Sequence, residues 1–189
     1  MEYNEIKIKL SILVLTIPER ADKLNRLENI LRPHLPIDNS VELIISEDLP
    51  ARDGGLTIGA RRNAALEIAQ GEYVCFVDDD DIVTYDYIQE ILKAIESKPD
   101  VVGIKGHYIK GKNDPELFIQ SIDYGDWFKG EDGIYYRPPT HLNPVKRELA
   151  MQVKFPNKNQ GEDRDYSLAL RKLLKTEVML ENPIYVYYK

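Results

Sequence analysis

The sequence predicts an α/β fold, with a mostly parallel sheet and helices packed on its faces. Apolar runs of strand length alternate with helical patterns from residue 6 to residue 104. The third of these runs leads directly into four consecutive aspartates, and parallel sheets bind ligands at the carboxyl ends of their strands. The length of 189 residues suits a single domain, and no repeat or linker rich in Gly and Ser divides it. We therefore expect one domain over 1–189.

The first half of the chain carries the alternation. Residues 6–15 are β-branched and aliphatic, which predicts a buried strand. Leucine and isoleucine recur at helical spacing from Leu24 to Leu31, and Pro33 ends that helix. The same reasoning predicts, in order, a strand over 41–45, a loop over 46–55, a helix over 58–69, a strand over 73–77, a helix over 85–97 and a strand over 101–104.

The pattern loosens in the second half. Gly, Asp, Tyr and Trp predominate from His107 to Pro139, which indicates short strands and long loops. Residues 151–174 are expected to end in a helix with Tyr166, Leu170 and Leu173 on one face, and 183–188 predict a last strand.

Composition excludes several classes of function. The net charge of -7 makes nucleic acid an unlikely partner, because phosphate contacts need Lys and Arg. No stretch approaches the ~20 apolar residues of a membrane span, and the polar start lacks the apolar core of a signal peptide. Cys75 is the single cysteine and lies in an apolar run, so no disulfide framework is possible within the chain. These features predict a cytoplasmic protein.

The run Asp78, Asp79, Asp80 and Asp81 is the strongest indication of chemistry. Two like charges ~4 Å apart repel by ~4 kcal/mol at an effective dielectric near 20, and a divalent cation removes that cost. In an extended chain Asp78 and Asp80 point to one side and the other two aspartates to the opposite side. Oxygen ligands favour Mg²⁺ or Mn²⁺, completed by substrate phosphates and water. The alternative is a solvated acidic turn that caps the next helix, and the position after an apolar strand favours the site.

A second acidic segment, Gly161 to Tyr166, precedes the late helix. Gly161 gives the turn conformational freedom, and carboxylates are stabilised at a helix start by the helix dipole. Taken alone, this segment is best explained as helix capping by Glu162 or Asp163.

Three segments occur in a fixed order: SILVLTIPER at 11–20, GARRNAALEIAQGEYVCFVDDDD at 59–81 and GEDRDYSLALR at 161–171. The ordered set resembles the family 2 glycosyltransferases, in which an apolar strand ends in a DxD motif and a Glu-Asp motif follows late in the chain. The resemblance implies a GT-A (Rossmann-like) fold, a nucleoside-diphosphate sugar donor, a glycan, glycoprotein or other hydroxyl acceptor, a Mn²⁺ or Mg²⁺ cofactor, and inversion at the anomeric carbon. It also implies a nucleotide-sugar-binding half at 1–105 and an acceptor-binding half at 106–189.

The resemblance assigns roles by position. Asp80 would hold the metal and Asp78 would lie beside it near the ribose, while His141 is either a further ligand or a histidine of the core or surface. Asp163 would be the general base, with Glu162 as the competing candidate because neighbouring helical side chains point about 100° apart. The residues expected to bind the donor are Thr16, Glu19, Arg20, Glu47, Asp48, Arg62, Asp78, Asp79 and Arg137.

Two segments depart from the family pattern. Ile17, Pro18 and Glu19 stand where family members more often have Tyr-Asn. Residues 46–48 read Ser-Glu-Asp in place of paired aspartates, which leaves the base-binding carboxylate open between Glu47 and Asp48. The resemblance favours UDP over GDP. The chain lacks the long C-terminal extension and membrane helices of many family members, so it resembles short, stand-alone GT-A proteins, some of which viruses and phages encode.

The second half also offers aromatic and cationic side chains. Aromatic rings stack on sugars or pack in cores, and cations suit a diphosphate. The candidates are Trp127, Tyr135 and Tyr136 for stacking, and Arg137 and Lys146 for the diphosphate. The tyrosines within 185–188 are expected to pack in the last strand.

Three alternatives stay open at this point. A haloacid-dehalogenase-like phosphatase also uses DxD after an apolar strand, but there the motif normally follows the first strand, and Ile82 stands here in place of Thr. A nucleotidyltransferase would need a Gly-rich basic loop after the first strand, and 15–22 contains no glycine. A non-catalytic nucleotide-sugar-binding module would share the fold without turnover.

Overall fold

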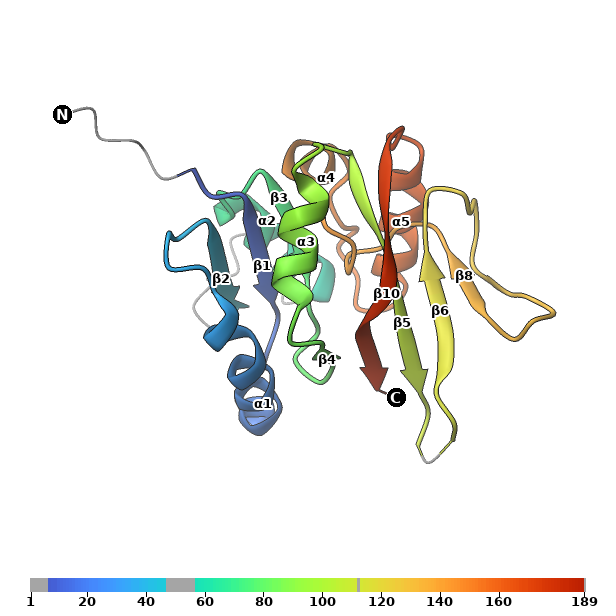
Figure 1. The fold of residues 1–189 in the computed structure, drawn as a ribbon, viewed down its shortest axis with the longest axis horizontal. Helices are drawn as coiled ribbons and strands as arrows, with labels where there is room; N and C mark the ends of the chain where they lie inside the picture. Colours follow the sequence, from blue (N-terminus) through green and yellow to red (C-terminus); the bar gives the residue numbers. More distant parts are fainter. Residues whose placement is uncertain (1–6, 47–56, 112, 189) are drawn as a thin grey trace.

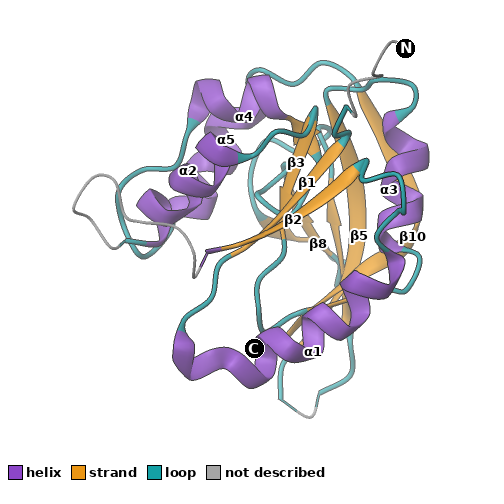
Figure 2. Ribbon diagram, turned by 90° about the vertical axis from the view of Figure 1, so that its left-hand side faces the viewer, coloured by secondary structure: helices purple, strands orange, loops and turns teal. Residues whose placement is uncertain are grey.

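A single sheet organises the chain in the computed structural model, which describes residues 7–46, 57–111 and 113–188. Ten strands belong to this sheet within the described residues, eight of them in the order β2-β1-β3-β9-β5-β6-β8-β7. Helices α2, α4 and α5 cover one face and helices α1 and α3 the other (Figure 1, Figure 2). The predicted α/β architecture with helices on both faces is confirmed.

The N-terminal part of the sheet is parallel, as expected. The strands β1 (Leu10–Val14), β2 (Val41–Ile45) and β3 (Tyr73–Phe76) pair in parallel on either side of β1. The helices α1 (Ala21–Leu31) and α2 (Ile58–Ile68) follow β1 and β2 in the chain. The Thr57 side chain accepts a hydrogen bond from the Ala60 N–H and caps the start of α2.

The fourth predicted strand does not pair with β3, which corrects the expectation that the first four strands form one parallel sheet. Strand β5 (Val101–Ile109) runs beyond the predicted 101–104, and the two-residue strand β9 (Val145–Lys146) lies between it and β3. β9 is antiparallel to both neighbours. The sheet as a whole is therefore mixed. A strand of two residues carries no periodicity, so the sequence pattern could not indicate it.

The remaining strands are short. They are β4 (Ile82–Val83), β6 (Glu116–Gln120), β7 (Phe128–Lys129) and β8 (Tyr135–Arg137). Short 3-10 turns at Pro18–Arg20 and Arg32–His34 flank α1, and α3 spans Tyr87–Ile95. The expectation of short strands and long loops over 107–139 holds apart from β5, which continues to Ile109.

The predicted helical region at 151–174 contains one whole helix and part of another. Helix α4 (Arg147–Val153) and helix α5 (Glu162–Arg171) are joined by a loop that contains Pro156 and ends at Gly161, whose φ is 69°. Proline cannot donate to the helical ladder and glycine accepts a positive φ, so the chain turns here. Tyr166 and Leu170 face the core as predicted, but Leu174 is buried in place of Leu173.

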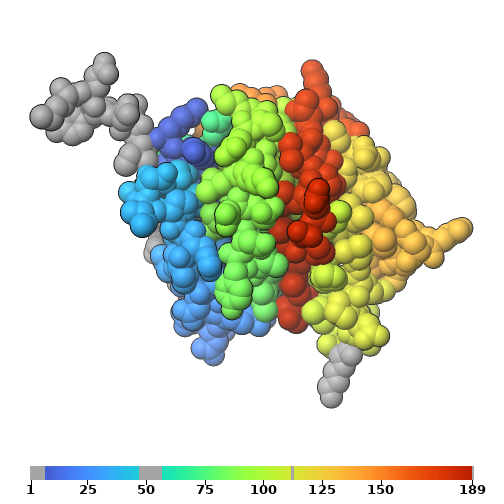
Figure 3. Space-filling view, viewed as in Figure 1, coloured from blue at the N-terminus to red at the C-terminus, as the bar shows by residue number. Residues whose placement is uncertain are grey.

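The last strand is longer than predicted. Strand β10 (Glu177–Tyr188) pairs with β5 in parallel and with β4 antiparallel. Its register with β5 shifts between Met179 and Pro183. Because this irregularity interrupts the alternation of side chains, the sequence pattern did not predict the first half of the strand. In space β10 lies beside α3, although the two are far apart in sequence (Figure 3).

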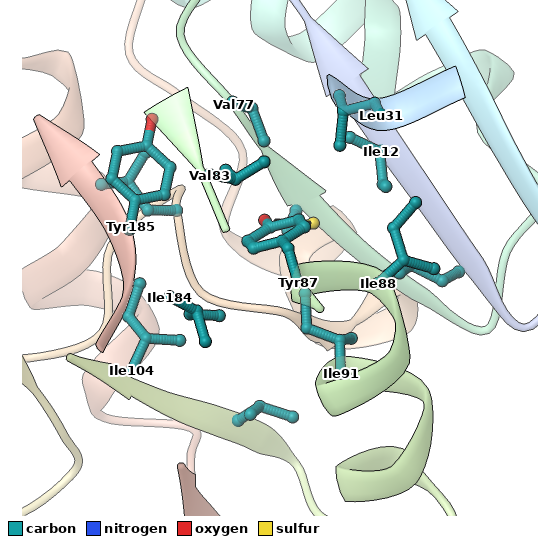
Figure 4. Packing of buried hydrophobic residues seen from close by; sticks show 14 of the residues in the cluster. Ile12, Leu31, Val77, Val83, Tyr87, Ile88, Ile91, Ile104, Ile184 and Tyr185 are labelled. Carbon is teal, nitrogen blue, oxygen red and sulfur yellow. Dashed lines mark hydrogen bonds between the residues drawn. The ribbon is translucent and has the colours of Figure 1, made fainter. Parts of the chain in front are cut away.

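Two hydrophobic clusters hold the layers together. The cluster on the α1 and α3 side includes Ile12, Tyr87, Ile91, Ile104 and Tyr185, whose side chains meet between the sheet and α3 (Figure 4). The cluster on the opposite side joins the sheet to α2, α4 and α5 and contains the Phe155 and Tyr166 rings, stacked 4.0 Å apart. The second cluster therefore fixes α2 and α5 against the sheet, while the first fixes α1 and α3 against its other face.

Candidate active site

The site lies where β1 and β3 end. A cavity of about 460 Å³ opens there, lined by Leu15, Thr16, Ile17, Arg20, Ile58, Arg61, Arg62, Asp78, Asp79, Asp80 and Tyr187. Six of these side chains belong to residues predicted to bind the donor or the metal: Thr16, Arg20, Arg62, Asp78, Asp79 and Asp80. Topology brings these residues, distant in sequence, to one edge of the sheet.

Asp78 is held from two sides. The Arg62 Nη2 donates to its Oδ1 at 3.2 Å, and the His141 Nε2 lies 3.5 Å from its Oδ2. Burial opposes ionisation, but His141 and Arg62 together lower the pKa of the Asp78 carboxyl well below its usual value. Burial lowers the pKa of His141, and the Arg62 charge acts in the same direction. A neutral imidazole that donates to a carboxylate is consistent with both shifts.

Asp79 and Asp80 are paired with cations of the segment that follows β1. Arg20 Nη1 donates to Asp79 Oδ1 at 2.7 Å, and Lys23 Nζ donates to Asp80 Oδ2 at 3.2 Å. Arg26 Nη2 donates to the backbone carbonyl of Asp80 at 2.7 Å. Charge repulsion within the acidic run is therefore reduced by protein cations, so this repulsion alone does not require a metal.

Asp81 has a different role from its neighbours. Its side chain is fully buried and accepts hydrogen bonds from the Tyr185 hydroxyl at 2.7 Å and from the Tyr188 N–H at 3.0 Å. Burial raises the pKa of Asp81 to about 8, and the nearby Asp78 charge acts in the same direction. Asp81 thus fastens the loop after β3 to β10. The Asp78 N–H donates to Tyr185 Oη at 3.2 Å, so the same tyrosine also fixes the start of the acidic run.

Thr16 and Ser46 join the ends of β1 and β2. The Thr16 N–H donates to Ser46 Oγ at 2.7 Å, and Arg61 donates to the Thr16 carbonyl and, at 2.8 Å, to Ser46 Oγ. Glu19 is exposed and does not line the cavity. The predicted base-binding pair, Glu47 and Asp48, lies outside the described residues.

The late acidic segment reaches the same edge through Arg62. Glu162 is 5% exposed, and its Oε1 lies 3.9 Å from Arg62 Nη2. Asp163 is more exposed and, among the described residues, has no cation within ion-pair distance. Arg62 itself is 5% exposed, with its guanidinium 5.3 Å from the Phe76 ring centre and 5.5 Å from that of Phe155. The Asp78 and Glu162 motifs are therefore joined by one buried cation.

Some predicted residues do not reach the cavity. Arg137 is not among its lining residues and lies with its guanidinium 4.2 Å from the Trp127 ring centre. Lys146 pairs with Asp100 at 2.9 Å. Tyr136 stacks on Phe128, away from the acidic run.

The fit of a divalent cation rests on the donor set. Carboxylate oxygens of Asp78 and Asp80 are hard ligands that suit Mg²⁺ or Mn²⁺. His141 contacts Asp78, but the described residues contain no group of three His, Cys, Asp or Glu side chains arranged to hold a metal. A cation here would need oxygens from a bound diphosphate, as the sequence reasoning expected.

Five side chains of the site were missed or given another role by sequence reasoning. Lys23, Arg26 and Arg61 were not considered, although the first two recur at helical spacing after Arg20. Tyr185 and Tyr187 were expected only to pack in a strand. Tyr187 lines the cavity, and Tyr185 anchors the acidic run.

The comparisons with known proteins point to one family. The sequence model of Glycosyl transferase family 2 matches residues 51–176. Glycosyltransferase GlyG of Streptococcus pneumoniae is 27% identical over 79% of this chain and 52% of its own length. The amylovoran biosynthesis glycosyltransferase AmsB of Erwinia amylovora is 25% identical over 93% of this chain and 59% of its own length. The chain thus spans little more than half the length of these curated relatives.

The solved structures show the same fold. The crystal structure of Staphylococcus aureus TarS 1–349 in complex with UDP-GlcNAc matches 96% of this chain and 58% of that chain, with a TM-score of 0.67 and 16% identity. The GT-A-like fold is confirmed. These relatives are bacterial, so the expected kinship with viral and phage proteins has no support from them. Over the described residues, no helix combines the length and apolar character needed to cross a membrane.

Proposed function

Because the chain belongs to Glycosyl transferase family 2, we propose that it transfers a sugar from a nucleoside-diphosphate sugar to an acceptor hydroxyl, with inversion at the anomeric carbon. UDP is the favoured nucleotide and a hexose the favoured sugar, since the structurally similar TarS binds UDP-GlcNAc. The acceptor would be a glycan, a glycoprotein or another hydroxyl compound. Membership of this family argues against the phosphatase and nucleotidyltransferase alternatives. The cytoplasmic location stays a prediction.

The donor would occupy the cavity at the ends of β1 and β3. Arg20, Arg61 and Arg62 line it together with the acidic run, so a diphosphate would meet several cations as well as carboxylates. Mn²⁺ or Mg²⁺ would be held by Asp80 with Asp78, and by His141 where its ring nitrogen reaches the cation. When bound, the cation would neutralise charge that develops on the departing diphosphate.

Asp163 would act as the general base. In a single displacement, the acceptor oxygen forms a bond to the anomeric carbon while the bond to the diphosphate oxygen breaks, and the nucleoside diphosphate leaves with that electron pair. The acceptor proton passes to the Asp163 carboxylate. The observation that carries this choice is the contrast with Glu162, which is buried beside Arg62, whereas Asp163 is more exposed and free of a cation partner among the described residues.

The test is Asp163→Asn, measured on hydrolysis of UDP-N-acetylglucosamine with water in place of the acceptor. UDP binding by calorimetry should persist, while hydrolysis falls by about two orders of magnitude or more. The control is Asp165→Asn on the same helix, since Asp165 is paired with Lys158 at 2.6 Å and should be dispensable. Unchanged hydrolysis in Asp163→Asn, or a first-formed sugar that retains the donor configuration, would show that the base is elsewhere. A module without catalytic activity would bind UDP and release no sugar.

A further inference from the structure

An arginine without an anionic partner lies beside the proposed base. The Arg137 side chain is partly buried, and within the described part of the chain no carboxylate or hydroxyl lies within hydrogen-bonding distance of its guanidinium. The guanidinium makes a cation–π contact with the indole of Trp127, whose ring centre is 4.2 Å away. Burial lowers the pKa of Arg137, while the Tyr187 hydroxyl and the Asp163 carboxylate oppose the shift. An arginine keeps its charge despite such a shift. Arg137 is therefore a partly buried cation without a counter-ion among the described residues.

Trp127 is fixed to the helix that carries the base. Its indole N–H donates to Ser167 Oγ at 3.5 Å, and Ser167 Oγ in turn donates to the Pro138 carbonyl, next to Arg137 in the chain. Ser167 follows Asp163 by four residues in α5, so the two lie on the same helix face. Arg137, Trp127 and Asp163 therefore belong to one side of the site, held by a single helix and strand β8.

Arg137 and Trp127 lie outside the lining of the donor cavity, although Tyr187, whose hydroxyl acts on Arg137, is part of that lining. The residues that line the cavity include Arg20, Arg61 and Arg62 but neither Arg137 nor Trp127. Three other arginines thus already line the cavity proposed for the donor diphosphate. An unpaired arginine on an aromatic ring, outside that cavity and beside the base, suits the acceptor: the ring takes a sugar or polyol face, and the guanidinium takes an anion in bidentate geometry.

We propose that Arg137 on Trp127 forms an acceptor subsite for a hydroxyl compound that carries an anionic group, a phosphate or a carboxylate. The acceptor would place its hydroxyl at Asp163 and its anion on Arg137. This inference rests on the proposed function, and it names the chemical class of the acceptor.

The chain contains one tryptophan, so its fluorescence reports on this subsite directly. The UDP-loaded protein would be titrated with glucose 6-phosphate, with glucuronate and with glucose while Trp127 emission is followed. We expect a saturable change with one or both anionic compounds and at least tenfold weaker binding of glucose. Arg137→Gln should weaken the anionic compound at least tenfold and leave glucose unchanged, and Arg137→Lys should fall between the two proteins because it keeps the charge without the fork.

Arg164→Gln is the matched control. Arg164 also lies near Trp127 but is already paired with Asp126 at 3.1 Å, so its loss should leave anion binding unchanged. UDP affinity, measured by calorimetry in the same variants, separates the two proposals. If the wild-type protein does not bind UDP, the proposed function fails. If it binds UDP but does not distinguish anionic from neutral compounds, or if Arg137→Gln weakens UDP as strongly as the anion, the subsite assignment is wrong.

Discussion

Replacing the buried cation between the two acidic motifs gives the sharpest test of this site. Arg62→Met keeps most of the apolar stem of the side chain and removes the guanidinium, which lies near the Phe76 and Phe155 rings. Asp78 would lose its contact at 3.2 Å, and Glu162, with a side chain only 7% exposed, would lose the nearby cation at 3.9 Å. Breaking a buried pair by removing one partner costs about 3–5 kcal/mol, because the remaining charge stays buried. For a domain of this size that corresponds to a fall in Tm of roughly 6–20 °C.

The pH dependence should identify the cause. The folded-state pKa of Asp78 is lowered, with burial opposing and the neighbouring His141 and Arg62 producing the shift. A carboxyl with a lowered pKa contributes stability that is present above its unfolded pKa, about 3.9, and is lost as pH falls through the folded value. The gap in unfolding free energy between wild type and Arg62→Met should therefore be full at pH 7 and shrink below pH ~4.

Urea denaturation at several pH values measures the unfolding free energy lost in Arg62→Met and the dependence of that loss on pH. Arg32→Met is the control, since Arg32 is 56% exposed and pairs with Glu28 one helical turn away. It should cost less than about 0.5 kcal/mol at every pH. A cost below about 1 kcal/mol for Arg62→Met, or a cost that does not vary with pH, would refute the reasoning.

Three further predictions concern other parts of the structure. A Cβ at Gly59 would lie 1.9 Å from the backbone carbonyl oxygen of Pro156, so Gly59→Ala should destabilise the protein by about 1–3 kcal/mol in urea denaturation. Burial raises the pKa of Glu177, so the folded state holds its proton to higher pH than the unfolded state does. The stability of wild type relative to Glu177→Gln should therefore decrease as pH rises above ~4.3. Lys23→Met removes one of two ion pairs of the Asp80 carboxylate, the other being with Arg20 at 3.5 Å. An exposed pair contributes ~0.2–1 kcal/mol, so calorimetry with UDP should show Mn²⁺ binding up to about fivefold tighter.

Each of these predictions has a contrary result. Gly125→Ala meets nothing within 4 Å and should be neutral, so equal costs at the two glycines would contradict the packing argument. Parallel stability curves for wild type and Glu177→Gln would contradict the raised pKa. Lys154→Met is the metal control, because Lys154 makes an ion pair of the same length, 3.2 Å, with similar exposure, 47% against 48%. Weaker or unchanged Mn²⁺ binding in Lys23→Met would contradict competition at Asp80.

Sequence reasoning was most successful where a pattern had enough length. The strand that ends at Phe76 is wholly apolar and the one that ends at Val14 is apolar apart from Ser11, so their place in the sheet and the position of the acidic run could be predicted. The strand at Val145 could not be predicted, because two residues show no alternation. The shift of register before Pro183 similarly concealed half of β10.

The site shows the same division. Asp78 and Arg62 were predicted because they belong to ordered motifs. The pairing of Lys23 with Asp80 and of Tyr185 with Asp81 depends on tertiary contacts across 57 and 104 residues, which no local spacing expresses. Arg137 was expected to meet a diphosphate from its chemistry alone, and its position on Trp127 became apparent only from the fold.

The late arrival of β9 and β10 has a consequence for how the protein is made. During synthesis, strands β1, β2 and β3 and the acidic run emerge first, but β5 is joined to β3 through Val145 and Lys146, which follow much later. Asp81 then remains without its partners until Tyr185 and Tyr188 have been added. Contacts of such long separation close slowly and leave strand edges open in the meantime. A nascent chain stalled before residue 185 should therefore lack a formed cavity at the ends of β1 and β3, even though almost every residue that lines this cavity has already left the ribosome.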